Sequence, residues 1–135
     1  MSAVALLRDI FRYNAWANAE FFASLEGLDS ARHDEPRHLA IGLLSHCHVV
    51  NRIFMAHLTG AAHGYAASNT EQTLALDELR AAVAETDRWY LDYLETISAD
   101  ALAEPIAFVF TDGDRGRMSR QEMLTHAAIH GAYHR

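Results

Sequence analysis

Apolar residues recur every three or four positions in four long segments of the chain, with polar residues between them. On an α-helix this spacing gathers the apolar side chains on one face, so it predicts four amphipathic helices. The first spans about residues 2–27 and the second about His38–Leu58, and each has a glycine at or just after its end. The third spans about Leu74–Ile97, and the fourth runs from Ser119 to the end of the chain.

The segments between these helices have the composition of loops, apart from one stretch before the fourth helix. Residues 29–37 are polar and residues 61–73 are small, polar and rich in turn formers. Ile106–Phe110 is apolar and is followed by the turn-forming segment Thr111–Gly116. This order predicts a short hairpin or irregular insertion between the third and fourth helices.

Four helices of this kind in 135 residues predict an all-α fold, specifically a four-helix bundle that forms a single domain over residues 1–135. The links between the first and second helices and between the third and fourth are long enough to leave the topology open.

Charge and cysteine content narrow the classes of function. The net charge is -7, which argues against binding to a nucleic-acid backbone, since that needs clustered basic side chains. A single cysteine, Cys47, excludes an internal disulfide and every multi-cysteine zinc motif, and it fits a cytoplasmic protein. We expect Cys47 to be a small buried apolar residue. No uncharged apolar run reaches the roughly 18 residues of a membrane span, so we expect no membrane partner.

Histidine is the residue type that suggests chemistry. The fourth helix opens with the capping-box pair Ser119 and Glu122 and then carries His126, His130 and His134, each four residues from the next. Imidazoles four residues apart lie on one helix face and can close on one metal ion. His126 and His134 are about 12 Å apart along the axis, so only neighbouring pairs can share an ion.

A third imidazole is available on the second helix. His46 follows the apolar positions Leu39 and Leu43 at helical spacing, whereas His48 points about 200° away from it. The favoured ligand set is therefore His46 with His130 and His134, and His126 with His130 is the rival pair. Three imidazoles would leave one coordination position open for water or substrate. The plainer interpretation is that these are surface or hydrogen-bonded core histidines.

The other polar candidates have ordinary interpretations. We expect His33, His38, His48 and His63 to be exposed to solvent, because polar residues surround them. Asn14 and Asn18, four residues apart on the first helix, are candidates to support the site. Glu85 and Asp87 could accept a hydrogen bond from an imidazole, but solvated charges on a helix surface are commoner.

Three motifs, in order, resemble the DinB family of DinB/YfiT-like metalloenzymes. They are Tyr13–Asn18 in the first helix, Leu44–Phe54 with Leu58-Thr59-Gly60 in the second, and His126–Arg135 in the fourth. The resemblance covers nearly the whole chain and implies a four-helix bundle, often dimeric. It also implies one divalent metal ion, commonly zinc or nickel, on three histidines, which by motif position are His46, His130 and His134.

The resemblance also suggests a function. Relatives include transferases and isomerases that use low-molecular-weight thiols. The chain is therefore expected to be a metal-dependent transferase or hydrolase that acts on a small molecule, with such a thiol as a candidate cosubstrate, and to form a homodimer. The alternatives are a non-catalytic metal-binding or stress-related bundle, and a structural bundle without metal.

Two departures from the family pattern affect these expectations. Ser45 and Asn51 stand where relatives often have asparagine and aspartate. The fourth helix of relatives usually continues past the His-Arg pair, whereas this sequence ends at Arg135. A terminal turn frays readily, so we expect His134 to need a metal ion or a partner subunit to hold it, unless the helix is shortened in the sequence given.

Overall fold

The structure is a computed structural model that describes residues 1–135. It is mostly helical, which is consistent with the predicted all-α class, and it also contains one two-stranded sheet. Its elements in chain order are α1 (Ala3–Glu26), α2 (Asp34–Thr59), α3 (Leu76–Thr96), α4 (Ala99–Ala103), β1 (Pro105–Val109), β2 (Arg115–Ser119) and α5 (Arg120–His134).

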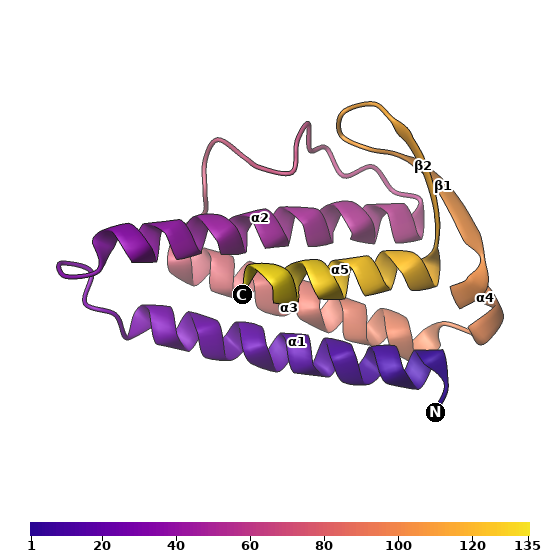
Figure 1. Cartoon of the computed structure of the whole chain (residues 1–135), viewed down its shortest axis with the longest axis horizontal. Helices are drawn as coiled ribbons and strands as arrows, with labels where there is room; N and C mark the ends of the chain where they lie inside the picture. The colour runs from indigo at the N-terminus through magenta and orange to yellow at the C-terminus, as the bar shows by residue number, and fades with distance from the viewer.

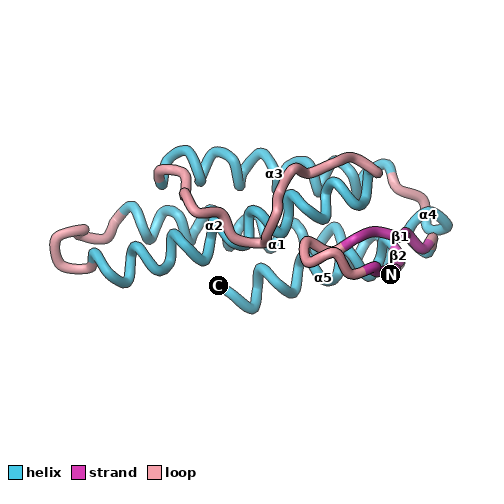
Figure 2. Tube along the Cα trace, turned by 90° about the horizontal axis from the view of Figure 1, so that it is seen from above, coloured by secondary structure: helices cyan, strands magenta, loops and turns pink.

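The four long helices lie side by side (Figure 1). α1 packs on α3 and α5, and α2 packs on the same two helices. α2 and α3 run in one direction and α1 and α5 in the other (Figure 1). Because α2 and α3 are parallel, the loop between them has to return along the molecule, and it passes over the helices in Figure 2. The long connection therefore lies between the second and third helices, which the sequence analysis did not single out.

α2 begins four residues earlier than predicted, and its first turn explains why. Asp34 and Glu35 occupy that turn, where carboxylates favour the positive end of the helix dipole. Pro36 follows at a position where no intrahelical N–H donor is needed. The proline therefore belongs to the helix start and not to the preceding connection. The short helix α4 was not expected; the Ser98 side chain caps it by accepting a hydrogen bond from the Ala101 N–H (3.1 Å).

Two groups of buried apolar side chains fill the interior, with polar side chains between them. On α1, Leu7 and Phe11 belong to the larger group and Phe22 and Leu25 to the smaller, with buried Asn14 in between. The same order recurs on α3, where the buried polar pair Thr86 and Asp87 separates Leu79 and Val83 from Tyr90 and Leu94. A polar layer thus crosses the helices at mid-height.

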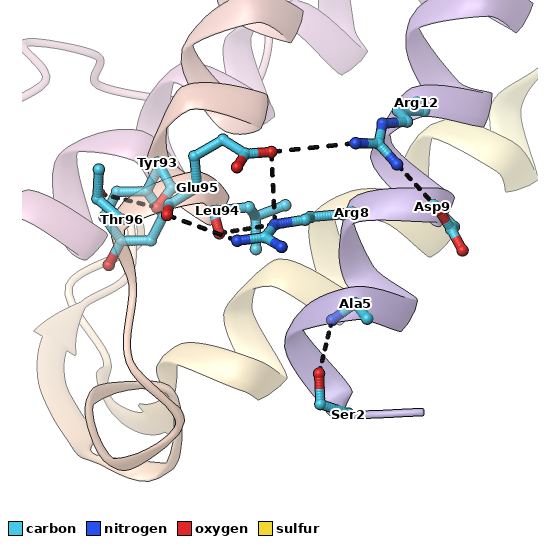
Figure 3. Close-up of polar contacts among 9 residues, drawn as sticks. All are labelled: Ser2, Ala5, Arg8, Asp9, Arg12, Tyr93, Leu94, Glu95 and Thr96. Carbon is cyan, nitrogen blue, oxygen red and sulfur yellow. Dashed lines mark hydrogen bonds and ion pairs between the residues drawn. The ribbon is translucent and has the colours of Figure 1, made fainter.

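A polar contact ties the end of α3 to the start of α1 (Figure 3). The Arg8 side chain donates hydrogen bonds to the backbone carbonyls of Leu94 (3.2 Å) and Glu95 (3.5 Å). These carbonyls lie in the last turn of α3, where no helical N–H is left to bond them. Arg8 also pairs with the Glu95 carboxylate at 3.5 Å, so one side chain caps the helix and joins two elements.

The predicted hairpin is present, and it closes over α2. β1 and β2 pair antiparallel, with Phe108 opposite Gly116. The Phe108 ring is buried and packs against His57 of α2, with ring centroids 4.7 Å apart. A Cβ atom at Gly116 would lie 2.6 Å from the tip of Phe108 and 2.7 Å from the Phe110 ring. Glycine is therefore required at residue 116 for the aromatic rings to reach α2.

By length and composition alone, α2 could cross a membrane, with a mean hydropathy of 1.3 over its best 18-residue window. The helix contributes its apolar face to the interior between α3 and α5, however, and 44% of that window is buried. The core helix of a folded domain passes the same test, so this composition does not by itself indicate a membrane span.

We predict that Gly116→Ala lowers the free energy of unfolding by about 1–3 kcal/mol, because the added methyl group forces the Phe108 ring out of its packed position. Urea denaturation would measure the change. Gly42→Ala is the matched control, because a Cβ atom there meets nothing within 4 Å and alanine favours a helix interior. A Gly116→Ala protein as stable as wild type would show that the hairpin adjusts freely.

Candidate metal centre

Three histidines converge between α2 and α5. One ring nitrogen each from His46, His130 and His134 lies within 4.8 Å of the other two. The Nε2 atoms of His46 and His130 are 3.1 Å apart. The rings stand at steep angles, with the planes of His46 and His134 at 89° and those of His130 and His134 at 72°. The structure thus brings together the three residues favoured from the sequence.

The local sequence places each ring. The capping box at the start of α5 is complete, since the Ser119 hydroxyl accepts from the Glu122 N–H (3.1 Å) and the Glu122 carboxylate accepts from the Ser119 N–H (2.7 Å). The helix then carries His130 and His134 one turn apart on the side that faces α2. The packing of α2 against α5 supplies His46 across the interface.

The buried face of α2 differs from the face predicted by Leu39 and Leu43. Leu39 and Leu43, which suggested a buried face, are exposed by 66% and 36%. The buried face of α2 is rotated toward Leu44, Cys47 and Val50. His46 lies at the edge of that face and is half-buried. An edge position allows a ring to reach both a neighbouring helix and a solvent-accessible cavity.

Ser68 sets the orientation of the His46 ring. Its backbone carbonyl lies 2.9 Å from Nδ1 of His46. A carbonyl can only accept, so Nδ1 carries the proton and the lone pair of Nε2 points toward His130. This tautomer is the one that a metal ligand needs. Ser68 belongs to the loop between α2 and α3, and nothing in the sequence distinguished its carbonyl from others in that loop.

The three imidazoles fit a tetrahedral metal ion. Bonds of about 2.0–2.1 Å from zinc to nitrogen place two ligand nitrogens roughly 3.3 Å apart. The 3.1 Å separation of the His46 and His130 nitrogens is close to this value, and the 4.8 Å limit on the whole set requires only small ring rotations. No fourth histidine, cysteine, aspartate or glutamate joins the group.

The electrostatics keep His130 neutral. Burial, together with the neighbouring rings of His134, His46 and His126, lowers the pKa of His130 to about 4. At neutral pH the ring is therefore uncharged and has a lone pair available for an electrophile or a metal ion. Its Nδ1 atom is buried without a hydrogen-bond partner.

The remaining histidines divide into three kinds. His33 and His38 are exposed, as expected. His126 is exposed and stacks on His130, with ring centroids 5.9 Å apart, but it is not part of the converging group. The prediction of exposure was wrong for His63 and His48. His63 is half-buried, and its Nδ1 atom accepts a hydrogen bond from the backbone N–H of Tyr65 (3.0 Å). For His48, burial lowers the pKa to about 4, and its Nδ1 has no partner.

Arg135, which follows His134 at the end of α5, makes two close hydrogen bonds to α1. The guanidinium of Arg135 donates to the side-chain oxygens of Asn18 (2.8 Å) and Asn14 (2.7 Å) on α1. The side-chain amide of Asn18 in turn donates to both carboxylate oxygens of Asp87 on α3 (3.3 and 3.1 Å).

This network corrects two expectations. Asp87 is buried, not solvated, and burial raises its pKa to about 6 while Asn18 and Arg135 oppose that shift. It contacts Asn18 and not an imidazole, whereas Glu85 is exposed as expected. The final turn of α5 is also held by Arg135, a route that the sequence analysis did not consider. Asn14 and Asn18 therefore support the helix end that carries His134.

We predict that Arg135→Ala lowers the free energy of unfolding by about 1–3 kcal/mol, because the buried Asp87 carboxylate loses its compensating cation. Chemical denaturation at pH 7.5 would measure the loss. Arg117→Ala is the control, since Arg117 is exposed on β2. Adding Asp87→Asn to Arg135→Ala should recover part of the loss. A double variant no more stable than Arg135→Ala would mean that the uncompensated charge is not the cause.

We also predict that the metal-free protein becomes less stable as the pH falls from about 6.5 to 4, partly because of His48. The pKa of His48 is about 4 in the folded state against 6.5 when unfolded, so in this range only the unfolded state binds the proton. His48→Gln should therefore reduce the decrease in the free energy of unfolding by about 1–3 kcal/mol. Denaturation series at both pH values would measure it. An equal decrease in both proteins would contradict the prediction.

Comparison with known proteins agrees with the motifs and the fold. The family model described as DinB family matches residues 1–135, the whole chain. Comparisons with curated proteins and with solved structures gave no match. The resemblance inferred from the three motifs is thus confirmed over the full length, and the mostly helical structure with its three converging histidines is consistent with it. The chain belongs to the DinB family.

Proposed function

We propose that this protein is a four-helix bundle of the DinB type that holds one divalent metal ion on His46, His130 and His134. We propose further that it is an enzyme, a metal-dependent transferase or hydrolase that acts on a small molecule, with a low-molecular-weight thiol as a candidate cosubstrate. The observation that carries the proposal is the convergence of three imidazole nitrogens within 4.8 Å of one another.

The donor set favours zinc or nickel. Neutral imidazole suits both ions, whereas magnesium and calcium prefer oxygen ligands. Three protein ligands leave a fourth position for water or substrate, which is how a catalytic zinc site differs from a closed structural one. When bound there, such an ion would lower the pKa of water or of a thiol, so that a nucleophile exists near neutral pH.

The surrounding residues have separate tasks in this proposal. The Ser68 carbonyl holds the His46 ring in the tautomer that directs Nε2 inward. Arg135 anchors the turn that carries His134. A cavity of about 330 Å³ adjoins His46 and His130 and gives a small molecule access to them. This cavity favours a reacting site over a purely structural one.

The proposal also covers the cellular location of the protein and its binding partners. We propose a cytoplasmic protein that forms a homodimer and has neither nucleic acid nor a membrane as partner. The net charge of -7 supports the exclusion of nucleic acid.

Metal analysis of the purified protein tests the central claim. We predict about one equivalent of zinc or nickel in the wild type, and a 10-fold or greater loss of metal affinity in His46→Ala and His130→Ala, because each removes one of three ligands. His126→Ala is the matched control, because it removes an imidazole one turn from His130 that lies outside the converging group. Equal loss in His126→Ala would contradict the ligand assignment.

A second measurement separates the enzyme from a non-catalytic metal protein. Wild type and His130→Ala would be compared for conjugation of a model electrophile with a small thiol. Turnover lost in the variant supports the transferase. Full metal occupancy with no exchangeable ligand at the fourth position would sink the enzyme proposal and leave a metal-binding bundle.

A further inference from the structure

The cavity beside the triad has a composition that indicates what fills it. It lies between α2, the hairpin and α5, and its volume is about 330 Å³. His46 and His130 line it together with Ser68. The other side chains around it are Val50, Ile53, Phe54, His57, Phe108, Phe110, Thr111, Met118 and His126.

No aspartate, glutamate, lysine or arginine lines this cavity. Its polar groups are four imidazoles and the small residues Ser68 and Thr111. Away from the proposed metal ion, a carboxylate or ammonium group placed among these side chains would lose its water without gaining a counter-ion, which is costly. An uncharged group would lose little and would gain apolar contact. The lining therefore discriminates by charge.

The walls are also aromatic and arranged as a series. Phe54 of α2 lies between His126 (ring centroids 5.0 Å apart) and Phe108 (6.5 Å apart). Phe108 in turn contacts His57 at 4.7 Å and Phe110 at 4.8 Å. These separations are typical of stacked and edge-to-face aromatic pairs, so a further flat ring can join the series.

Burial distinguishes the floor of the cavity from its mouth. Val50, Ile53, Phe54 and Phe108 are each less than one-tenth exposed, so they form a fixed apolar floor. Phe110, Thr111 and His126 are exposed and lie where a ligand would enter. A volume near 330 Å³ is at the small end of ligand sites, which limits the occupant to about one ring and a short reactive group.

We propose that this cavity binds the uncharged aromatic body of the substrate. A donor atom on a short arm of the substrate would then reach the metal ion that we propose on the three histidines. The substrate class is a small neutral aromatic compound with one metal-binding group, such as an arylmethyl thiol. Thiols whose body carries carboxylates are excluded from this cavity. The binding of the donor atom to a metal ion rests on the proposed function, whereas the binding of the aromatic body rests on the cavity alone.

Three primary thiols with different bodies test the proposal on the cobalt-loaded protein. They are benzyl mercaptan, 2-mercaptoethanol and 4-(mercaptomethyl)benzoate, whose carboxylate cannot reach the ion that its sulfur binds, and the thiolate-to-metal charge-transfer absorption reports binding at the ion. Burial of the phenyl ring should make benzyl mercaptan bind about 10- to 100-fold more tightly than 2-mercaptoethanol, and the carboxylate should remove that advantage from 4-(mercaptomethyl)benzoate. If benzyl mercaptan binds no more tightly than either of the other two thiols, the proposal is overturned.

Variants of the hairpin locate the effect. Phe108→Ala should reduce the advantage of benzyl mercaptan over 2-mercaptoethanol at least 5-fold. Thr111→Arg places a cation at the exposed mouth and should raise the affinity for 4-(mercaptomethyl)benzoate. Val109→Ala is the control, because Val109 is exposed on the same strand and does not line the cavity. If Phe108→Ala keeps the full preference for benzyl mercaptan over 2-mercaptoethanol, the phenyl ring of the thiol binds elsewhere and the proposal is overturned.

A metal-independent arm keeps the two proposals apart. Toluene added to the metal-free protein should shift the methyl resonances of Val50, Ile53 and Met118, and succinate should not. Toluene shifts without a charge-transfer band for any thiol would defeat the open metal position and leave the cavity assignment standing. A charge-transfer band without toluene shifts would defeat the cavity assignment and leave the open metal position standing.

Discussion

The hydrogen bonds of Arg135 to Asn14 and Asn18, and of Asn18 to Asp87, form the interaction on which the rest of the structure depends. They join three helices through a layer that divides the apolar interior into two groups. A carboxylate buried in such a layer would be destabilising alone. Arg135 and Asn18 compensate it, and because Arg135 directly follows His134, the same contacts hold the last turn of α5 in place.

The histidine triad depends on this layer. His134 directly precedes Arg135, so its ring is positioned by a turn that α1 and α3 hold from the other side. His46 is oriented independently, by the carbonyl of Ser68 in the loop that returns along α2. The three rings are thus supported by separate parts of the chain, and this leaves the cavity side of His46 and His130 free for a ligand.

The hairpin adds the element that a plain set of helices would lack. Gly116 lets the Phe108 and Phe110 rings fold against their own strand partner, so Phe108 can pack on His57 and Phe54. The result is an aromatic wall that begins at His130 and continues through His126 and Phe54 to the hairpin. The imidazoles thus lie at one end of this cavity and the aromatic rings of Phe54, Phe108 and Phe110 line the rest of it.

The sequence alone determined the four long helices, apart from the start of α2, and the pairing of His130 with His134, because a helical period of 3.6 residues makes side chains four apart neighbours whatever surrounds them. It also identified the capping box at Ser119, since both partners are local. Only the tertiary structure decided that Asp87 is buried and His48 half-buried, that Leu39 is exposed, and that Ser68 and Arg135 support the triad. Periodicity states which residues share a face, but burial depends on what packs against that face. Here Ser68 lies 22 residues from the His46 ring that it orients, and Asn18 lies 69 residues from the Asp87 carboxylate that it contacts.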